Sequence, residues 1–260
     1  MKANYHTHTH FCGHAGGTAI EYAEEAIKHN FKILGISDHA PNDNVHDYHV
    51  RMKMERLEEY LKDIEIAQDK TKGKIIIYKG LEVEYFDKHE EYYNNLEQKV
   101  DYMIHGQHYV IRNNNLSKLI SSFDLRRKED IHLYADFMIS AMKSKRFLFH
   151  AHPDLFMCGY KNWDKDAIEV TKKILEVAKE TDAIFEYNAN GNRRGRVMTP
   201  LGEQPLYPRI EFWDLVKEYG IRTILSSDCH QPFLLYDDTM KEVEEVYNNL
   251  KLKDVGIIEL

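Results

Sequence analysis

Apolar residues fall into short runs rich in β-branched and aromatic side chains, and these runs alternate with longer stretches at helical spacing. The short runs predict strands at 3–6, 33–37, 74–84, 102–106, 147–149, 183–187 and 223–227. The longer stretches predict helices at 18–30, 52–71, 89–98, 129–144, 164–181, 208–219 and 239–250. Strand–helix alternation is typical of a parallel sheet with right-handed crossovers, and about seven such units predict a closed or nearly closed barrel.

Boundary signals support this division of the chain. Thr18 and Glu21 have the spacing of a capping box at a helix start. Pro208 suits the first turn of a helix, and Gly220 suits its end. Because no linker, low-complexity tract or repeat interrupts the 260 residues, the prediction is one domain spanning 1–260.

Composition excludes several classes of protein. A formal net charge of -8 argues against a general nucleic-acid binder, which needs a basic face. No run approaches the ~18 apolar residues of a membrane span, and the N-terminus has no signal-peptide core. The three cysteines form no CxxC pair, which fits a reducing compartment. We expect a cytoplasmic protein without a membrane partner, either a monomer or a small homo-oligomer.

Many of the fifteen histidines cluster near acidic residues at the ends of the predicted strands. The groups, in chain order, are His6 and His8, Asp38 and His39, Glu82 and Glu84, His108, His150 and His152, and Asp228 and His230. The carboxyl ends of parallel barrel strands meet at one mouth, where active sites form. These side chains are therefore expected around one cavity, although surface histidines in loops are the simpler alternative.

The spacing of these residues suits metal binding. Residues i and i+2 of an extended chain face one side, so His6 and His8 can bind one metal. Imidazole with carboxylate suits Zn²⁺, Mn²⁺ or Fe²⁺, and a carboxylate such as Glu82 can bridge two ions. Two ions ~3.5–4 Å apart stabilise an in-line displacement at phosphorus. The pattern predicts a metal-dependent hydrolase.

The same residues carry a family resemblance, which spans almost the whole chain in family order. The run His6-Thr7-His8-Thr9-His10-Phe11-Cys12-Gly13-His14 resembles the first motif of the PHP (polymerase and histidinol phosphatase) family. Five later segments of this chain resemble the later motifs of the family, in the same order. They are Ser37-Asp38-His39-Ala40, Gly80-Leu81-Glu82-Val83-Glu84-Tyr85, Gly106-Gln107-His108-Tyr109, His152-Pro153-Asp154-Leu155 and Ser227-Asp228-Cys229-His230. The Gly106-Gln107-His108 stretch departs from the Ser-Val-His form common in the family. The resemblance implies a distorted (β/α)7 barrel, similar to a TIM barrel, with a trinuclear metal centre at the carboxyl ends of the strands.

The resemblance also implies which residues hold the three divalent ions, Zn, Mn or Fe. Carried over by position, the ligands are His6, His8, Glu82 and Asp228 for the first, Glu82, His108 and His152 for the second, and His14, His39 and His230 for the third. The family pattern favours Glu82 over Glu84 and His152 over His150. Spacing alone leaves both of these choices open.

A glycine-bearing loop with three arginines follows the sixth predicted strand. Arginine forks match phosphate oxygens, whereas the plain alternative is a solvated basic turn. Arg193 best matches the arginine after Asn-x-x-Gly in the related phosphatases, and Arg194 and Arg196 are further candidates. The loops 42–50 and 113–125 are either lids over the site or connectors.

The resemblance implies a phosphomonoesterase of the stand-alone type that hydrolyses L-histidinol phosphate in histidine biosynthesis. Glu82 and Asp228 would be essential, and Asp228, His39 or His230 would supply the leaving alkoxide with a proton, directly or through water. The alternatives are an enzyme for another small phosphate ester or a nucleic-acid end, and a non-catalytic metal-binding domain. The acidic charge speaks against a processive nuclease, and the complete ligand set speaks against a non-catalytic domain.

Two further histidines, two cysteines and Asp38 have simpler interpretations. His10 is expected to line the pocket without binding metal, and His105 is expected to be a packed, hydrogen-bonded histidine. Cys12 and Cys229 are interpreted as small buried side chains. Asp38 is expected to orient His39 or another ligand.

Overall fold

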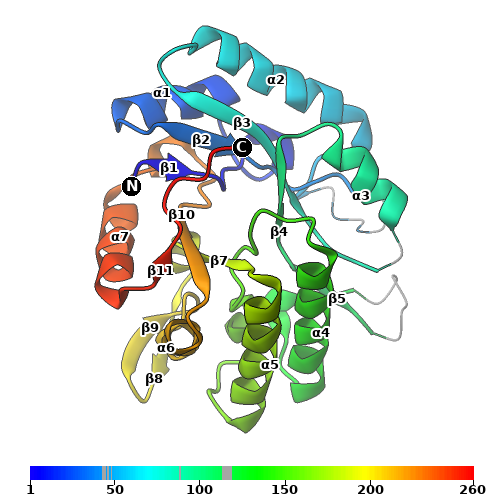
Figure 1. Cartoon of the computed structure of the whole chain (residues 1–260), viewed down its shortest axis with the longest axis vertical. Helices are drawn as coiled ribbons and strands as arrows, with labels where there is room; N and C mark the ends of the chain where they lie inside the picture. Colours follow the sequence, from blue (N-terminus) through cyan, green and yellow to red (C-terminus); the bar gives the residue numbers. More distant parts are fainter. Residues whose placement is uncertain (43–44, 46, 48, 88, 113–118) are drawn as a thin grey trace.

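Two groups of parallel strands form one curled sheet, shown in Figure 1. The computed structural model describes residues 1–42, 45, 47, 49–87, 89–112 and 119–260. The first group has the order β1–β2–β3–β4, with bounds Ala3–Asn4, Ile33–Ile36, Ile76–Val83 and Tyr102–His105. The second has the order β11–β10–β7, with bounds Lys253–Asp254, Arg222–Ser226 and Ile184–Asn188. All neighbours within both groups are parallel, as the strand–helix alternation predicts.

Single bridges join the two groups on both sides. Thr7 pairs with Cys229, and the His8 amide donates to the Cys229 carbonyl at 3.0 Å. On the other side, His150 pairs with both His105 and Phe185. The predicted strand at 147–149 is therefore not a regular strand, although its backbone bonds to both neighbours. The chain turns at His152, which has a φ of 33°, so the extended run is too short to form a longer ladder.

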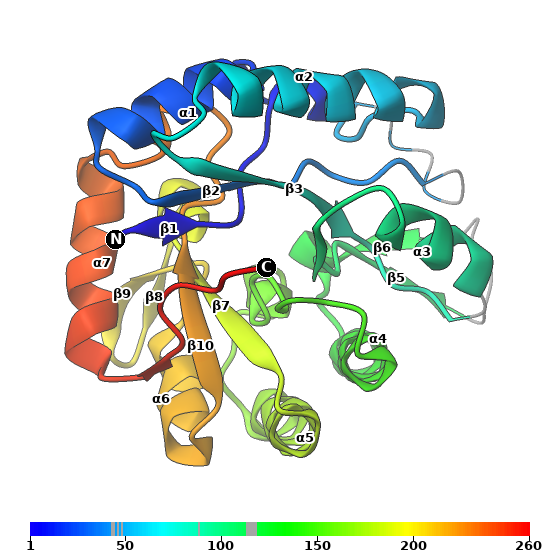
Figure 2. The same ribbon diagram turned by 45° about the horizontal axis from the view of Figure 1, so that its top comes forward.

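Helices cover the outer face of the curled sheet (Figures 1 and 2). Each predicted helix is present: α1 Ala19–Lys28, α2 Leu57–Lys70, α3 Glu90–Glu97, α4 Lys128–Ser144, α5 Lys165–Thr181, α6 Ile210–Tyr219 and α7 Asp238–Leu250. The expected capping box is confirmed, since the Thr18 amide donates to Glu21 Oε2 at 2.8 Å. Gly220 ends α6 with a φ of 66°, where glycine avoids the strain of a side chain. Among these helices of the described chain, none is long and apolar enough to cross a membrane.

Two antiparallel hairpins were not predicted. They are β5–β6, with bounds Tyr109–Ile111 and Leu119–Ser121, and β8–β9, with bounds Arg196–Thr199 and Gly202–Pro205. Both are short and alternate apolar with polar residues only weakly. The first begins beside His108, and the second places Arg196 in a strand rather than in the expected loop. Residues 113–118 and part of 42–50 lie outside the described residues, so the lid prediction stays open.

The interior of the curled sheet is packed shut below its carboxyl ends. Buried Tyr5, Tyr102 and Phe149 belong to one apolar cluster there. Tyr102 Oη donates to the Tyr5 carbonyl at 2.6 Å, and a Cβ added at Gly35 or Gly80 would overlap its ring. These glycines make room for the tyrosine between the strands. Among the described residues, this packing fills the interior below the carboxyl ends of the strands.

Candidate metal centre

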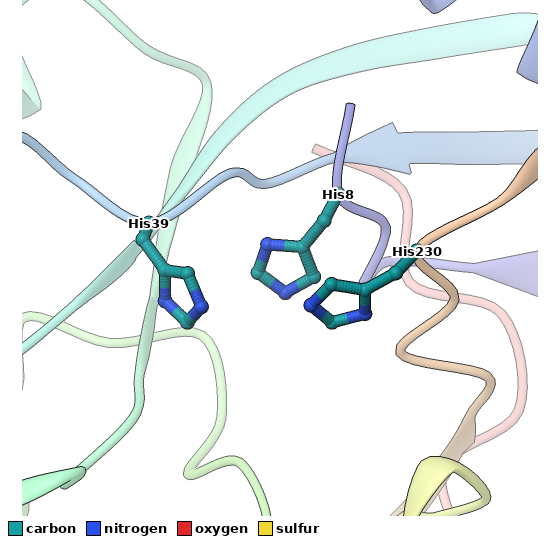
Figure 3. Close-up of side chains that lie close together, drawn as sticks. All are labelled: His8, His39 and His230. Atoms are coloured by element: carbon teal, nitrogen blue, oxygen red, sulfur yellow. The ribbon is translucent and has the colours of Figure 1, made fainter. Parts of the chain in front are cut away.

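The residues predicted to bind metal meet at the carboxyl ends of the strands, around a cavity of about 230 Å³. Figure 3 shows three of them, His8, His39 and His230, with their rings turned toward a common space. They come from segments that are far apart in the sequence and that follow β1, β2 and β10. The cavity wall includes His14, His39, Glu82, His108, His152, Asp228 and His230.

Four ligand atoms make the tightest group. His6 Nε2 lies 3.0 Å from His8 Nε2 and 3.4 Å from Glu82 Oε2. His8 Nε2 lies 3.2 Å from Asp228 Oδ1. A tetrahedral ion with ligands at 2.0–2.2 Å has ligand–ligand edges of about 3.3–3.6 Å. Glu82 Oε2 and Asp228 Oδ1 are buried and face histidine nitrogens, with His39 Nδ1 also 2.8 Å from Glu82 Oε2, so this donor set fits a divalent cation.

The second oxygen of Glu82 faces another pair of histidines. Glu82 Oε1 lies 2.9 Å from His152 Nε2 and 3.5 Å from His108 Nε2. Since Oε2 faces His6 and Oε1 faces His152, the Glu82 carboxylate has the geometry of a bridge between two ions. His150 pairs instead with His105, at 3.0 Å between the two Nδ1 atoms, on the side away from this group.

A third group of histidines lies on the other side of the first. Ligand atoms of His8, His39 and His230 lie within 4.8 Å of one another. His14 is exposed at the rim and forms a further group with His230 and Cys12. Burial raises the pKa of the Cys12 thiol, which disfavours a thiolate ligand. His10 joins none of these groups and instead interacts with the Gly17 carbonyl at 3.1 Å.

The protonation states suit metal ligands. Burial alone would raise the pKa of Glu82 and Asp228, but the surrounding histidines hold both values well below their usual range. Burial lowers the pKa of His8, and lowers that of His39 further. For His6, burial also lowers the pKa, but neighbouring carboxylates outweigh it and raise the value well above normal. His8 and His39 are therefore neutral, whereas the carboxylates around His6 favour a positive charge at that position, which either a proton or a divalent cation can supply.

Buried carboxylates orient the ligands from behind. Glu186 Oε1 lies 2.7 Å from His6 Nδ1, and Glu186 Oε2 accepts from the His152 amide at 3.0 Å. Glu84 Oε1 lies 2.8 Å from His108 Nδ1. These contacts fix which ring nitrogen of His6 and His108 faces the centre. Glu84 thus lies behind a ligand, and Glu82 lies among the ligands.

Sequence reasoning missed Glu186. The sequence nevertheless contained a sign of its role, because Glu186 is a charged residue inside the otherwise uncharged strand β7. In the structure it is fully buried. Asp38 was expected to orient a ligand, and the structure shows how. Its carboxylate accepts from the Thr9 and Cys12 amides, both at 3.0 Å, so it shapes the His6–His14 segment rather than contacting His39.

Two ligand candidates have left-handed backbone. His152 has a φ of 33° and Asp228 a φ of 46°. Non-glycine residues in this region cost on the order of 1–3 kcal/mol, and such strain gathers at functional sites. Both residues follow an extended segment of the curled sheet, and both line the cavity.

The three candidate arginines occupy different positions. Arg194 lines the cavity, with its guanidinium carbon 4.9 Å from the centre of the Phe123 ring. Arg193 is not in the cavity wall; it donates to Asp237 Oδ1 at 2.5 Å, although its Nε and Nη1 are buried without a partner among the described residues. Arg196 is exposed and donates to Glu203 Oε2 at 3.0 Å. The geometry brings Arg194 to the site in preference to Arg193.

Known proteins are similar to this chain in sequence and in fold. A probable histidinol-phosphatase of Deinococcus radiodurans is 29% identical over 250 residues, covering 93% of this chain and 92% of its own. A probable histidinol-phosphatase of Schizosaccharomyces pombe is 25% identical, covering 89% and 81%. The crystal structure of histidinol phosphate phosphatase from Lactococcus lactis, complexed with zinc, L-histidinol and phosphate, superposes with a TM-score of 0.70 at 17% identity, covering 97% and 95%.

The profile of the PHP domain matches residues 4–190, a stretch that contains most of the clustered ligand candidates. Its match extends over more than half of the 260 residues. The remaining candidates, Asp228 and His230, lie beyond the match and complete the same cavity. This chain belongs to the PHP domain family.

Proposed function

We propose that this protein is a metal-dependent phosphomonoesterase that hydrolyses L-histidinol phosphate to L-histidinol and phosphate. The observation that carries the proposal is Glu82, whose two buried oxygens face two different groups of histidines. The names of the relatives support the choice of substrate. The small cavity also suits a small ester, because pockets for drug-sized ligands measure roughly 300–1,000 Å³.

The proposal includes a single domain over 1–260 and a closed, distorted (β/α)7 barrel. The bridges of Thr7 with Cys229 and of His150 with Phe185 support closure, since each joins the two groups of strands. We further propose a cytoplasmic location, which the three free, buried cysteines support.

Three divalent ions, Zn, Mn or Fe, would be held by the residues grouped above. These are His6, His8, Glu82 and Asp228 for the first, Glu82, His108 and His152 for the second, and His14, His39 and His230 for the third. When bound, the ions supply Lewis acidity toward the phosphoryl group.

The chain's own residues would bind the phosphoryl group and guide protons. Arg194 would donate to phosphoryl oxygens, since its guanidinium lines the cavity. Asn188 Nδ2 donates to Asp228 Oδ2 at 3.0 Å, which leaves Oδ1 directed at the ligand group. Burial lowers the pKa of His230 to about 3 and that of His39 well below normal, so both rings are neutral at pH 7. We therefore assign the leaving alkoxide's proton to water that His39 or His230 binds.

Phosphate release from L-histidinol phosphate by protein reconstituted with Zn²⁺, Mn²⁺ or Fe²⁺ tests the proposal. p-Nitrophenyl phosphate and a simple alkyl phosphate run beside it. A strong preference for L-histidinol phosphate in kcat/KM supports the proposed substrate. Equal, slow hydrolysis of all three retains the metal hydrolase and rejects the substrate. Tight metal binding without turnover supports a non-catalytic domain, and trimming of a fluorescent oligonucleotide with Mn²⁺ supports a nuclease.

A further inference from the structure

Among the described residues, one carboxylate in the cavity wall is not engaged with the histidines. Asp47, Glu82 and Asp228 all line the cavity. Glu82 and Asp228 face ligand histidines, whereas Asp47 accepts a hydrogen bond from the Tyr109 hydroxyl. Asp47 belongs to the segment between β2 and α2, and Tyr109 begins β5. The pair therefore brings an anion to the mouth from outside the metal centre.

Two described residues near Asp47 in the sequence, Val45 and Arg51, are anchored. Val45 is fully buried in a cluster with Phe86 and Ile111. Arg51 is buried, donates to the Ala40 carbonyl at 3.3 Å and lies 3.4 Å from Glu84. Within the segment, the Asp47 amide donates to the Val45 carbonyl at 2.7 Å. These contacts fix the position of the carboxylate before a ligand arrives, so little ordering is needed on binding.

Among the described residues, the neighbours of Asp47 leave its charge available. Arg51 lines the same cavity, but its guanidinium is paired with Glu84, the residue that holds His108. Burial and the adjacent carboxylate raise the pKa of Tyr109, so its phenol remains a donor. An ionised carboxylate has about four acceptor positions, and Tyr109 occupies one. An ammonium group, with three donors, matches the positions that remain.

A free anion in a cavity that binds phosphate esters has an electrostatic cost for the binding of those esters. Like charges repel most strongly where water is excluded, so Asp47 weakens the binding of an ester whose only charge is its phosphate. A substrate that also carries a cation reverses the sign of this interaction. The cavity wall thus presents a cation, Arg194, beside Phe123, and an anion, Asp47, beside Tyr109. This arrangement is complementary to a zwitterionic ester.

We infer that Asp47, positioned by Tyr109, binds the ammonium group of an amino-substituted phosphate ester and selects such substrates over esters without an amine. The inference rests on the proposed phosphomonoesterase activity. It assigns a specificity-determining role to a residue outside the metal ligands, in a segment whose sequence carries no PHP motif.

The test compares two esters that differ only in the amine. These are L-histidinol phosphate and 3-(imidazol-4-yl)propyl phosphate, and the readout is the ratio of their kcat/KM values. We expect wild type to prefer the amino ester by roughly 10- to 100-fold, the range of a charge-assisted hydrogen bond. Asp47→Asn removes the charge at nearly constant size and should bring the ratio close to one. Tyr109→Phe should lower it by a smaller factor.

The control variant is Asp69→Asn, which removes one charge from the exposed face of α2 and should keep the wild-type ratio. If Asp47→Asn slows both esters by the same factor, Asp47 has a general structural role and the inference is wrong, while the proposed activity stands. If wild type hydrolyses both esters equally well, the inference is also wrong. If wild type hydrolyses neither ester nor p-nitrophenyl phosphate, the proposed function itself fails, and the inference fails with it.

Discussion

Glu186 holds His6 in one orientation: its Oε1 lies 2.7 Å from His6 Nδ1, and both side chains are fully buried. A carboxylate at this distance keeps a proton on Nδ1, so Nε2 is the nitrogen whose lone pair is offered to a metal ion. That nitrogen is the atom that faces His8, Glu82 and Asp228. The geometry of the first metal group therefore depends on a residue in β7 that touches no metal position itself.

Replacing Glu186 with glutamine should weaken metal binding without removing a ligand. The amide has one acceptor oxygen, so either His6 Nδ1 or the His152 amide, at 3.0 Å from Oε2, loses its partner. We expect zinc affinity to fall by about 10- to 100-fold in competition with a chelating dye. Glu180→Gln makes the same chemical change on the exposed end of α5 and should retain wild-type affinity. Unchanged affinity in Glu186→Gln would contradict the orienting role.

Glu82→Ala and Asp228→Ala should each abolish phosphate release, because each removes an oxygen from the four-atom group. The fold should survive, since both side chains lie above the packed interior that Tyr5 and Tyr102 fill. Circular dichroism and thermal melting check the fold, and phosphate release at saturating metal checks the activity. Near-normal turnover in either folded variant would show that the site lies elsewhere.

Arg193 and Arg194 are neighbours in the sequence, so substituting each of them gives a matched pair of variants. Arg194→Gln should lower kcat/KM for a phosphate ester by roughly 10- to 100-fold, because a charge-assisted contact to phosphate is lost. Arg193→Gln should mainly destabilise the protein, by about 1 kcal/mol, because Arg193 pairs with Asp237 at the start of α7. Steady-state kinetics and urea unfolding of both variants separate the two effects. A larger kinetic loss in Arg193→Gln would reverse the assignment.

Local rules in the sequence located the helices and the pairing of His6 with His8, whereas the family resemblance supplied the rest of the predicted ligand set. His6 and His8 share one face of an extended segment, and Thr18 with Glu21 satisfies a helix start within four residues. These features need no knowledge of distant parts of the chain. The parallel order of the strands followed from the alternation of elements, which leaves few topologies open.

The spacing of residues along the sequence could not predict contacts between distant segments. Which of Arg193 and Arg194 turns inward depends on Asp237, which competes for Arg193 from more than forty residues away. The role of Glu186 depends on its contact with His6, which lies 180 positions earlier in the sequence. Gln107, where the sequence departs from the family, shows its function only in three dimensions: its Nε2 donates to the Tyr109 carbonyl at 2.6 Å, and its Oε1 faces His105.

The bond to Gln107 fixes the protonation state of His105. Since Gln107 Oε1 is an acceptor, His105 Nε2 must donate across the 2.8 Å between them. His105 Nδ1 then accepts from His150 Nδ1 at 3.0 Å, so the ring is neutral. Burial lowers the pKa of His105 to about 4, below the 6.5 of an unfolded histidine. Between these values the unfolded chain binds a proton that the folded protein does not, so stability falls as the pH falls.

His105 should therefore account for a measurable part of the acid sensitivity. From pH 7 to pH 5, the shift predicts a loss of about 2 kcal/mol from this residue. His105→Asn retains an acceptor for His150 but cannot titrate, so it should start less stable at pH 7 and lose less than wild type on acidification. Urea unfolding of the metal-free proteins at both pH values measures the difference, with His49→Asn as a control on an exposed histidine. Equal losses in wild type and His105→Asn would mean that His105 is not the group whose protonation opposes folding.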